Sequence, residues 1–331
     1  MSQPSTQVIA IGNAIVDVMA PCADALIEQL GLVRGGMTLV DTARAQELYD
    51  AMGPAREISG GSAANTLAGL AALGSRCAFI GQVADDQLGE VFAHDVRAGG
   101  ISFATPARAG DPPTARCLIF VTPDGQRTMN TYLGASQFLP AGALDEAAIA
   151  DAEVLYLEGY LWDPEEPRAA MRRAIDAARN AGRKVAFTLS DPFVISRHGD
   201  DFRALIAAGL IDILFANHVE LAALTGHDDF HAGIAALQDQ VPVLVVTRGE
   251  AGAVAATGGE LFEVPAEPVA RVVDTTGAGD LFAAGFLHGH VGGRSIIDCL
   301  TLGAVCAGEI ISHYGARPEA DLRQLMAQRF S

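Results

Sequence analysis

Seven residues, Asp274–Asp280, combine a glycine-rich turn with two carboxylates, directly before an apolar segment. Gly277 and Gly279 favour a tight turn, because glycine adopts positive φ angles at little steric cost. The next segment, Leu281–Leu287, is apolar and compatible with a helix. A helix start of this kind presents several backbone N–H groups to one spot, reinforced by the helix dipole, so the turn predicts an anion hole for phosphate.

Asp280 gives this turn a chemical role. A carboxylate beside an anion hole is electrostatically unfavourable unless it acts, for example by accepting the proton of a hydroxyl group that attacks the bound phosphate. At a helix start we expect the pKa of Asp280 to stay near or below its ordinary value of ~3.9. In one alternative, Asp280 only charges the first helical turn. In another, the turn belongs to a dinucleotide-binding fold, which Phe282 in place of a third glycine disfavours.

Composition limits the partners of this chain. It has 331 residues, of which half are hydrophobic, and a net charge of −18, which argues against nucleic acid or an anionic membrane as a partner. Met1-Ser2-Gln3-Pro4 does not resemble a signal peptide, and no apolar run reaches the roughly 18 residues of a membrane span. The five cysteines are scattered, with no C-x-x-C pair, so we expect reduced thiols in a cytoplasmic protein.

Lysine is nearly absent, since Lys184 is the only one in the chain. A Walker A loop needs a Gly-Lys-Ser/Thr sequence, and protein kinases need a strand lysine with further motifs. Lys184 has no glycine-rich loop beside it. Phosphate chemistry in this chain is therefore expected to use backbone amides, arginine and Mg²⁺.

From about residue 140 the chain alternates short apolar runs with amphipathic segments. Repeated units of this kind predict an α/β fold, with a central parallel sheet and helices on both faces. The predicted strands are Val8–Asn13, Val154–Leu157, Val185–Leu189, Ile211–Ala216 and Val243–Thr247, and the helices between the later strands are 166–180, 201–208 and 232–238. Ligands bind such sheets at the carboxyl ends of the strands.

A smaller β-rich part precedes this alternation. Thr114–Leu133 contains two β-rich runs around Pro123-Asp124-Gly125, which is a hairpin signal. Together with short runs at Asp17–Ala20 and Met37–Val40, it predicts a small sheet outside the main fold. We therefore expect one domain over residues 1–331, with a discontinuous β lid from about 13–41 and 112–135.

Polar residues follow several predicted strands and turns. Asn13 and Asp17 follow the first strand, and Gly60-Gly61 with Asn65 opens a helix of small residues. Carboxylates and amides suit vicinal sugar hydroxyls, because they match their donors and acceptors.

Asn217 and Glu220 follow the predicted strand Ile211–Ala216. Residues three apart share one face of a helix and could hold a hydrated Mg²⁺ that bridges phosphates. The alternative is a structural one, in which Asn217 is a helix N-cap and Glu220 completes a capping box.

Three motifs together resemble the signatures of the pfkB (ribokinase-like) family of sugar and nucleoside kinases: Gly60–Asn65, Asn217–Glu220 and Asp274–Asp280. Further stretches are more similar to adenosine kinases than to ribokinase or fructokinase: Gly12–Asp17, Leu189–Phe193 and Ile211–Asn217. The resemblance covers essentially the whole chain and implies a ribokinase-like fold with a small β-sheet lid.

The resemblance also implies roles for individual residues. Those assigned to catalysis are Asp280, as the base for the sugar 5′-hydroxyl, and Gly277, Ala278 and Gly279, as the anion hole. Those assigned to ribose are Asn13, Asp17, Gly60, Gly61 and Asn65. Those assigned to ATP and its phosphates are Arg127, Asn217, Glu220, Thr247, Arg248, Gly249 and Thr275. Those assigned to metals are Glu220, for Mg²⁺ through water, and Asp274 with Thr276, for K⁺. An apolar pocket for the base is offered by Met37, Leu39, Met129, Tyr160 and Phe193.

The implied activity is ATP- and Mg²⁺-dependent phosphoryl transfer to the 5′-hydroxyl of a ribonucleoside, with adenosine as the first candidate. Asn130 and Thr131 make the lid less apolar than in animal adenosine kinases, so a guanosine or inosine kinase, or a ribokinase- or fructokinase-like sugar kinase, stays open. A site for a phosphorylated sugar needs positively charged side chains, and the lid segments offer mainly Arg127 and Arg116. Phosphorylated sugars are therefore disfavoured as substrates. A non-catalytic nucleoside-binding protein is a further alternative, disfavoured by the intact Asp280. A monomer and a homodimer fit equally well.

Overall fold

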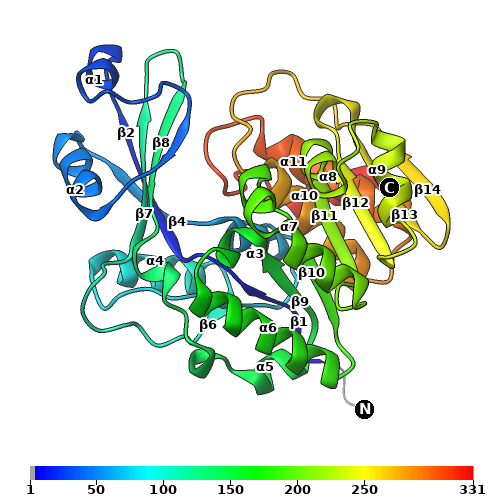
Figure 1. Ribbon diagram of the computed structural model, residues 1–331. Coiled ribbons are helices and arrows are strands. Elements are labelled where there is room, and N and C mark those ends of the chain that lie inside the picture. The colour runs from blue at the N-terminus through cyan, green and yellow to red at the C-terminus, as the bar shows by residue number, and fades with distance from the viewer. Residues whose placement is uncertain (1–3, 331) are drawn as a thin grey trace.

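The computed structural model describes residues 4–330, and its main feature is a nine-stranded sheet in the order β14-β13-β12-β11-β10-β9-β1-β5-β6 (Figure 1). Its strands are β1 (Thr6–Ile11), β5 (Cys77–Ile80), β6 (Ile101–Phe103), β9 (Ala152–Glu158), β10 (Lys184–Thr188), β11 (Ile213–Asn217), β12 (Val243–Thr247), β13 (Ala253–Thr257) and β14 (Glu260–Val264). The pairs from β6 to β12 are parallel, and the last two pairs are antiparallel. The predicted α/β class with a central parallel sheet is confirmed.

Helices cover both faces of this large sheet, because alternate strand residues supply two separate cores. In β9, Val154 and Tyr156 belong to one core, and Leu155 and Leu157 belong to the other. The helices of the first core are α3 (Ser62–Leu73), α4 (Gln87–Ala98), α10 (Ala278–Val291), α11 (Ile296–Ile310) and α12 (Leu322–Arg329). The helices of the second core are α5 (Glu146–Asp151), α6 (Glu165–Asn180), α7 (Pro192–Ala207), α8 (His218–Thr225) and α9 (Phe230–Leu237). Burial on both faces explains why these strands are apolar at consecutive positions.

A second sheet of five strands, the small sheet, stands at the upper left of Figure 1 with the order β3-β8-β7-β2-β4. Its strands are β2 (Ile15–Pro21), β3 (Met37–Leu39), β4 (Arg56–Gly60), β7 (Ala115–Val121) and β8 (Arg127–Tyr132), with the helices α1 (Asp24–Gln29) and α2 (Thr42–Ala51) joined to them. The predicted hairpin is confirmed, since β7 and β8 pair in antiparallel register. That this sheet acts as the lid of a single domain stays a prediction.

Two elements differ from the expectation. Gly60 was expected to open the helix of small residues together with Gly61, but it is the last residue of β4, because this segment pairs with β2; Gly61 alone is the N-cap of α3. Helix α7 begins at Pro192 rather than at 201, because Asp191 caps it by accepting a hydrogen bond from the Phe193 N–H and because proline suits the first helical turn.

Within residues 4–330, no helix combines the length and the apolar character that a membrane crossing requires. Met1, Ser2 and Gln3, where we expected no signal peptide, lie outside the described residues, as does Ser331.

Candidate functional site

The carboxyl ends of the parallel strands bring several predicted residues to one edge of the large sheet. Ile11 pairs with Leu157, so Asn13 and Glu158 follow neighbouring strand ends. Asn217 pairs with Thr247, so the ends of β11 and β12 lie next to each other. We call the region between this edge and the small sheet the candidate site.

Residues 59–65 are the end of β4 and the first turn of α3, and we call them the Gly60 turn. They pass very close to two polar residues of the candidate site. A Cβ atom on Gly60 would lie 2.6 Å from Asp17 Oδ2, and one on Gly61 would lie 2.3 Å from the Asn13 carbonyl oxygen. Gly61 also has a φ angle of +95°. Gly61 therefore requires glycine, and a side chain at Gly60 would displace the Asp17 carboxylate.

The start of α3 reaches Asp280 at the start of α10. The Ser62 hydroxyl donates to Asp280 Oδ1 at 2.6 Å, and the Asn65 amide donates to Asp280 Oδ2 at 3.1 Å. Asn65 Oδ1 is buried and has no hydrogen-bond partner within residues 4–330. A buried acceptor of this kind is costly unless a donor reaches it, so a bound hydroxyl group would fit there.

The expected low pKa of Asp280 is wrong. Burial raises the pKa of Asp280 above its ordinary value, although the hydrogen bonds from Ser62 and Asn65 and the positive charge of Arg317 lower it. The expectation considered only the helix dipole, whereas the side chain is packed between α3 and α10, where desolvation dominates. A raised pKa makes this carboxylate a better proton acceptor.

Asp17 lies on the face of the small sheet that is turned toward Asp280. Burial raises the pKa of Asp17 to about 6; Arg317 and Arg127 lower it, and Asp280 and Asp274 raise it further. Because directly paired strand residues share one face, the registers define this surface, which we call the inner face. Its first row is Asp17, Cys117, Thr131 and Leu39, and its second row is Met19, Ile119, Met129 and Met37. Beyond Asp17 these two rows are mainly apolar and rich in sulphur, with Thr131 as the polar member. Arg56 of β4 and Arg127 of β8 lie on the same face at its margins.

The exposed apolar side chains near the candidate site include predicted base-pocket residues. Met37 and Leu39 are 49% and 56% exposed, and Phe193 is 74% exposed. Tyr160 is 37% exposed. Desolvation of its hydroxyl group raises its pKa, and so do the negative charges of the nearby carboxylates Asp191, Asp280, Glu220 and Glu158. Tyr160 therefore lies within the electrostatic reach of both Asp280 and Glu220.

The Gly277 turn, residues 274–280, begins α10 as predicted. Gly277 is the N-cap residue with a φ angle of +78°, and no side chain caps the helix. A Cβ atom on Gly277 would lie 2.8 Å from Ala316 Cβ, whereas one on Gly279 would meet no atom within 4 Å. No side chain therefore occupies the start of α10 at Gly279, which suits an anion such as phosphate at this helix start.

Arg127 of β8 is paired with Asp274 of this turn. Arg127 Nη1 lies 2.5 Å from Asp274 Oδ2, and both side chains are almost fully buried. Asp274 also accepts hydrogen bonds from the N–H and hydroxyl of Thr276 and from the Gly315 N–H. The Arg127 guanidinium already neutralises Asp274. The oxygen atoms of Asp274 and Thr276 therefore do not fit a K⁺ ion in this arrangement. The potassium site stays a prediction that this geometry argues against.

Asn217 and Glu220 form the capping box that was the structural alternative. Asn217 Oδ1 accepts from the Val219 and Glu220 N–H groups, and Glu220 accepts from the Asn217 N–H and side-chain amide. Burial raises the pKa of Glu220 to about 7, the Asn217 N–H lowers it, and Asp191 raises it. Within residues 4–330 no group of three His, Cys, Asp or Glu side chains could hold a metal. A single carboxylate fits Mg²⁺ that is bound mainly by water and phosphate.

Three of the residues predicted to bind ATP and its phosphates lie at the end of β12. Thr247 ends this strand beside Asn217, and Arg248 and Gly249 follow it. The Arg248 guanidinium stacks 4.9 Å from the centre of the Phe230 ring. Thr275 is exposed on the Gly277 turn and accepts a hydrogen bond from the Ala278 N–H.

Glu158, at the end of β9, is a site residue that sequence reasoning missed. Its side chain is fully buried and accepts hydrogen bonds from the Asn13 N–H and side-chain amide, at 2.7 Å each, and from the Ala63 N–H at 2.8 Å. A Cβ atom on Gly12 would lie 2.7 Å from Glu158 Oε2. Its position one residue after the predicted strand Val154–Leu157 was the available signal.

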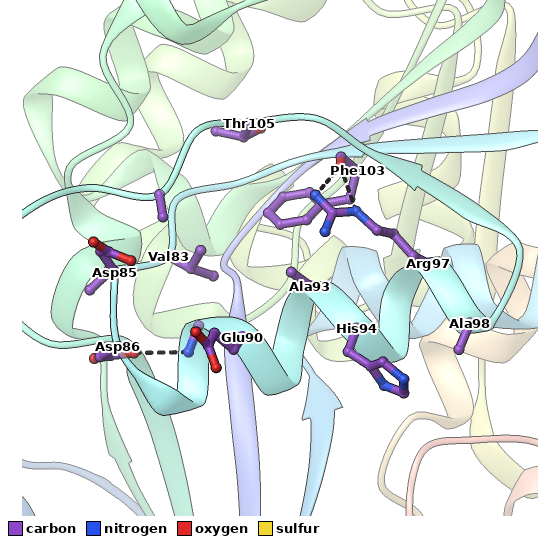
Figure 2. A pocket seen from close by; sticks show the side chains of 13 residues that line it. Val83, Asp85, Asp86, Glu90, Ala93, His94, Arg97, Ala98, Phe103 and Thr105 are labelled. Atoms are coloured by element: carbon purple, nitrogen blue, oxygen red, sulfur yellow. Dashed lines mark hydrogen bonds between the residues drawn. The ribbon is translucent and has the colours of Figure 1, made fainter.

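A cavity of about 620 Å³ lies apart from the candidate site, between α4 and the loop before it at one edge of the large sheet (Figure 2). Its polar lining serves the fold: Asp86 caps α4, and Arg97 donates to the Phe103 carbonyl oxygen. None of the predicted site residues lines it.

Glu158 predicts a pH dependence of stability. Burial raises the pKa of Glu158 from 4.5 to about 7, although the hydrogen bonds that it accepts from Asn13 and Ala63 lower it. Between these values the folded chain binds a proton that the unfolded chain does not, so the free energy of unfolding falls as pH rises from about 4.5 to 7. Glu158→Gln removes this contribution and should flatten the decrease, measured by urea unfolding at a series of pH values.

The control for this measurement is Glu166→Gln, which changes an exposed carboxylate of α6. Its pH dependence should match that of the parent. An unchanged slope in Glu158→Gln would contradict a buried, proton-binding Glu158.

Comparison with known proteins agrees with this geometry. A family model described as pfkB family carbohydrate kinase matches residues 35–322. A crystal structure of adenosine kinase from Sinorhizobium meliloti is 47% identical, covers 98% of this chain and 99% of its own, and has a TM-score of 0.91. A probable sugar kinase from Rhizobium etli is 44% identical, with 99% of each chain covered and a TM-score of 0.92. A fructokinase from Klebsiella pneumoniae is 32% identical over 73% of this chain and 80% of its own length. The chain therefore belongs to the pfkB family of carbohydrate kinases, phosphotransferases that act on a hydroxyl group.

Proposed function

We propose that this kinase transfers a phosphoryl group from ATP to the 5′-hydroxyl of a ribonucleoside, with adenosine as its substrate. The observation that carries the proposal is the inner face, where Asp17 stands beside a largely apolar surface formed by Met19, Ile119, Met129, Met37 and Leu39. A nucleoside matches this pattern, because its ribose offers vicinal hydroxyls and its base offers a large apolar face. A free sugar would leave Leu39 and Met37 without a partner.

The electrostatics favour a neutral acceptor over a phosphorylated sugar. Arg127 is neutralised by Asp274. Arg116 and its strand partner Tyr132 lie on the face of the small sheet opposite to the inner face. Arg116 donates a hydrogen bond to the Gln46 side chain there. Asp17 and Asp280 stand in the same region and would repel a second phosphate. The 47% identity to a structure called an adenosine kinase supports adenosine among the neutral candidates.

In the proposed reaction, Asp17, Gly61 and Asn65 hold the ribose hydroxyls, and the buried Asn65 Oδ1 accepts one of them. Asp280 accepts the proton of the 5′-hydroxyl as the bond from its oxygen to the γ-phosphorus of ATP forms and the bond from that phosphorus to ADP breaks. The N–H groups of the Gly277 turn stabilise the charge on the transferred phosphoryl group. Positioning carries most of the rate gain if the transition state is loose.

ATP is expected near Thr247, Arg248 and Gly249, with its phosphates directed toward the Gly277 turn. Glu220 would hold Mg²⁺ through water, and the ion would neutralise charge on the phosphates. No step of this proposal depends on K⁺.

A substrate panel tests the proposed function. ADP release is measured with ATP, Mg²⁺ and adenosine, guanosine, inosine, ribose or fructose. We expect adenosine to have the highest kcat/KM. Turnover of free sugars without nucleosides would keep the kinase fold and discard the base pocket, whereas no turnover with any of them would overturn the proposal.

Asp280→Asn tests the proton acceptor. The asparagine has the same size and can still bond to Ser62 and Asn65, so we expect normal folding and a loss in kcat of about 10²–10⁴-fold. The matched control is Asp145→Asn, which alters a helix cap far from the candidate site. A kcat close to that of the parent would rule out Asp280 as the base.

Leu39→Ser tests whether the nucleobase lies on the inner face. The loss of an apolar contact should lower kcat/KM for adenosine by about tenfold, since removal of a few methylene groups from a contact costs about 1–3 kcal/mol. Val33→Ser is the matched control, because Val33 is equally apolar and 67% exposed but lies outside the strands of the small sheet. Equal effects of the two substitutions would argue against a base at Leu39.

A further inference from the structure

Arg317, in the segment after α11, lies outside every motif that pointed to the reaction. Its guanidinium donates to the Ser59 carbonyl oxygen at 2.7 and 3.1 Å, to the Ser59 hydroxyl at 3.1 Å, and to the Ala64 carbonyl oxygen at 2.8 Å. One side chain therefore binds both ends of the Gly60 turn. Ser62 and Asn65 belong to the same turn, and both donate hydrogen bonds to Asp280.

The segment that carries Arg317 also contacts the Gly277 turn. The Gly315 N–H donates to Asp274 Oδ2, and Ala316 packs against Gly277. Glu309 fixes the far end of the segment by accepting from the Glu319 and Ala320 N–H groups. Arg317 thus links the Gly60 turn to the Gly277 turn through a segment that is anchored on both sides.

The charge of Arg317 acts on both carboxylates of the candidate site. The pKa of Arg317 falls to about 10 through burial, while Asp17, Asp280 and Asp95 raise it. Asp17 of β2 also faces Arg127, Asp280 and Asp274. Asp280 of α10 faces Arg317 and the donors Ser62 and Asn65, and it also interacts with Asp17, Glu158, Tyr156 and Tyr160. Two neighbouring carboxylates in a desolvated region tend to share one proton unless a cation stabilises both as anions.

We propose that Arg317 is a positioning residue for the transfer reaction, which holds the Gly60 turn against Asp280 and keeps Asp17 and Asp280 ionised together. The inference rests on the proposed function of Asp280 as the proton acceptor. A protonated Asp280 could not accept the proton of the hydroxyl group, so Arg317 sets the lower limit of the pH range in which the kinase works.

Two substitutions separate the charge of Arg317 from its hydrogen bonds. Arg317→Gln carries no charge and offers one amide group as a donor to this turn. Arg317→Lys keeps the charge with fewer donors in a less rigid arrangement. Arg323→Met is the matched control, because Arg323 donates to the Ala72 carbonyl oxygen at the other end of α3.

The readout is the pH profile of kcat/KM with the best substrate of the panel. We expect the acid limb of Arg317→Gln to move upward by about one pH unit, so that the loss relative to the parent is about tenfold larger below the midpoint than above it. Arg317→Lys and Arg323→Met should keep the midpoint of the parent. A uniform loss in Arg317→Gln at all pH values, with an unchanged midpoint, would overturn the proposal and leave a purely structural clamp.

A second measurement does not depend on turnover. Carbon-13 NMR follows the titration of the aspartate carboxyl groups in the protein without nucleotide, and Asp280→Asn identifies the Asp280 signal. The Asp280 signal should titrate at higher pH in Arg317→Gln than in the parent. An equal midpoint in both would refute the charge effect even if the kinase accepted none of the substrates tested, and a shifted midpoint without turnover would refute only the proposed function.

Discussion

The desolvation of three carboxylates in one region, with Glu158 fully buried and Asp17 and Asp280 half-buried, is the constraint on which the rest of the candidate site depends. Asp17, Glu158 and Asp280 come from a strand of the small sheet, a strand of the large sheet and a helix. Desolvation opposes their ionised forms, and the negative charge of Asp280 raises the pKa of both Asp17 and Glu158 further. Such a region is stable only if enough donors converge on it.

The donors come from segments that are far apart in the chain. Glu158 is satisfied by N–H groups of Asn13 and Ala63, and Asp280 by Ser62 and Asn65. The Gly60 turn is common to both sets, and its glycines allow the close approach that these bonds require. The same geometry leaves Asn65 Oδ1 without a donor, at the position where a substrate hydroxyl would be expected.

Sequence reasoning reached the fold and the motifs more easily than their partners. The alternation of strands and helices predicted the parallel sheet, and the carboxyl ends of its strands predicted which loops would meet. Glu158 and Arg317 lie outside the motifs, and their hydrogen bonds span 145 and 258 positions of the chain, so only the folded chain reveals them. The expected pKa of Asp280 was wrong for the same reason, because local sequence reports the helix dipole but not the desolvation caused by α3 and the small sheet.

The central claim is that Asp17 holds the ribose of a nucleoside beside Asp280. The most direct measurement compares kcat/KM for adenosine and 2′-deoxyadenosine in the parent and in Asp17→Asn. A hydrogen bond to a charged group contributes about 1.5–3 kcal/mol, so the parent should prefer adenosine by about 10–100-fold. Asp17→Asn keeps only a neutral hydrogen bond, which contributes about 0.5–1.5 kcal/mol, so its preference should be several-fold smaller. An equal preference in both proteins would contradict a contact between Asp17 and the 2′-hydroxyl.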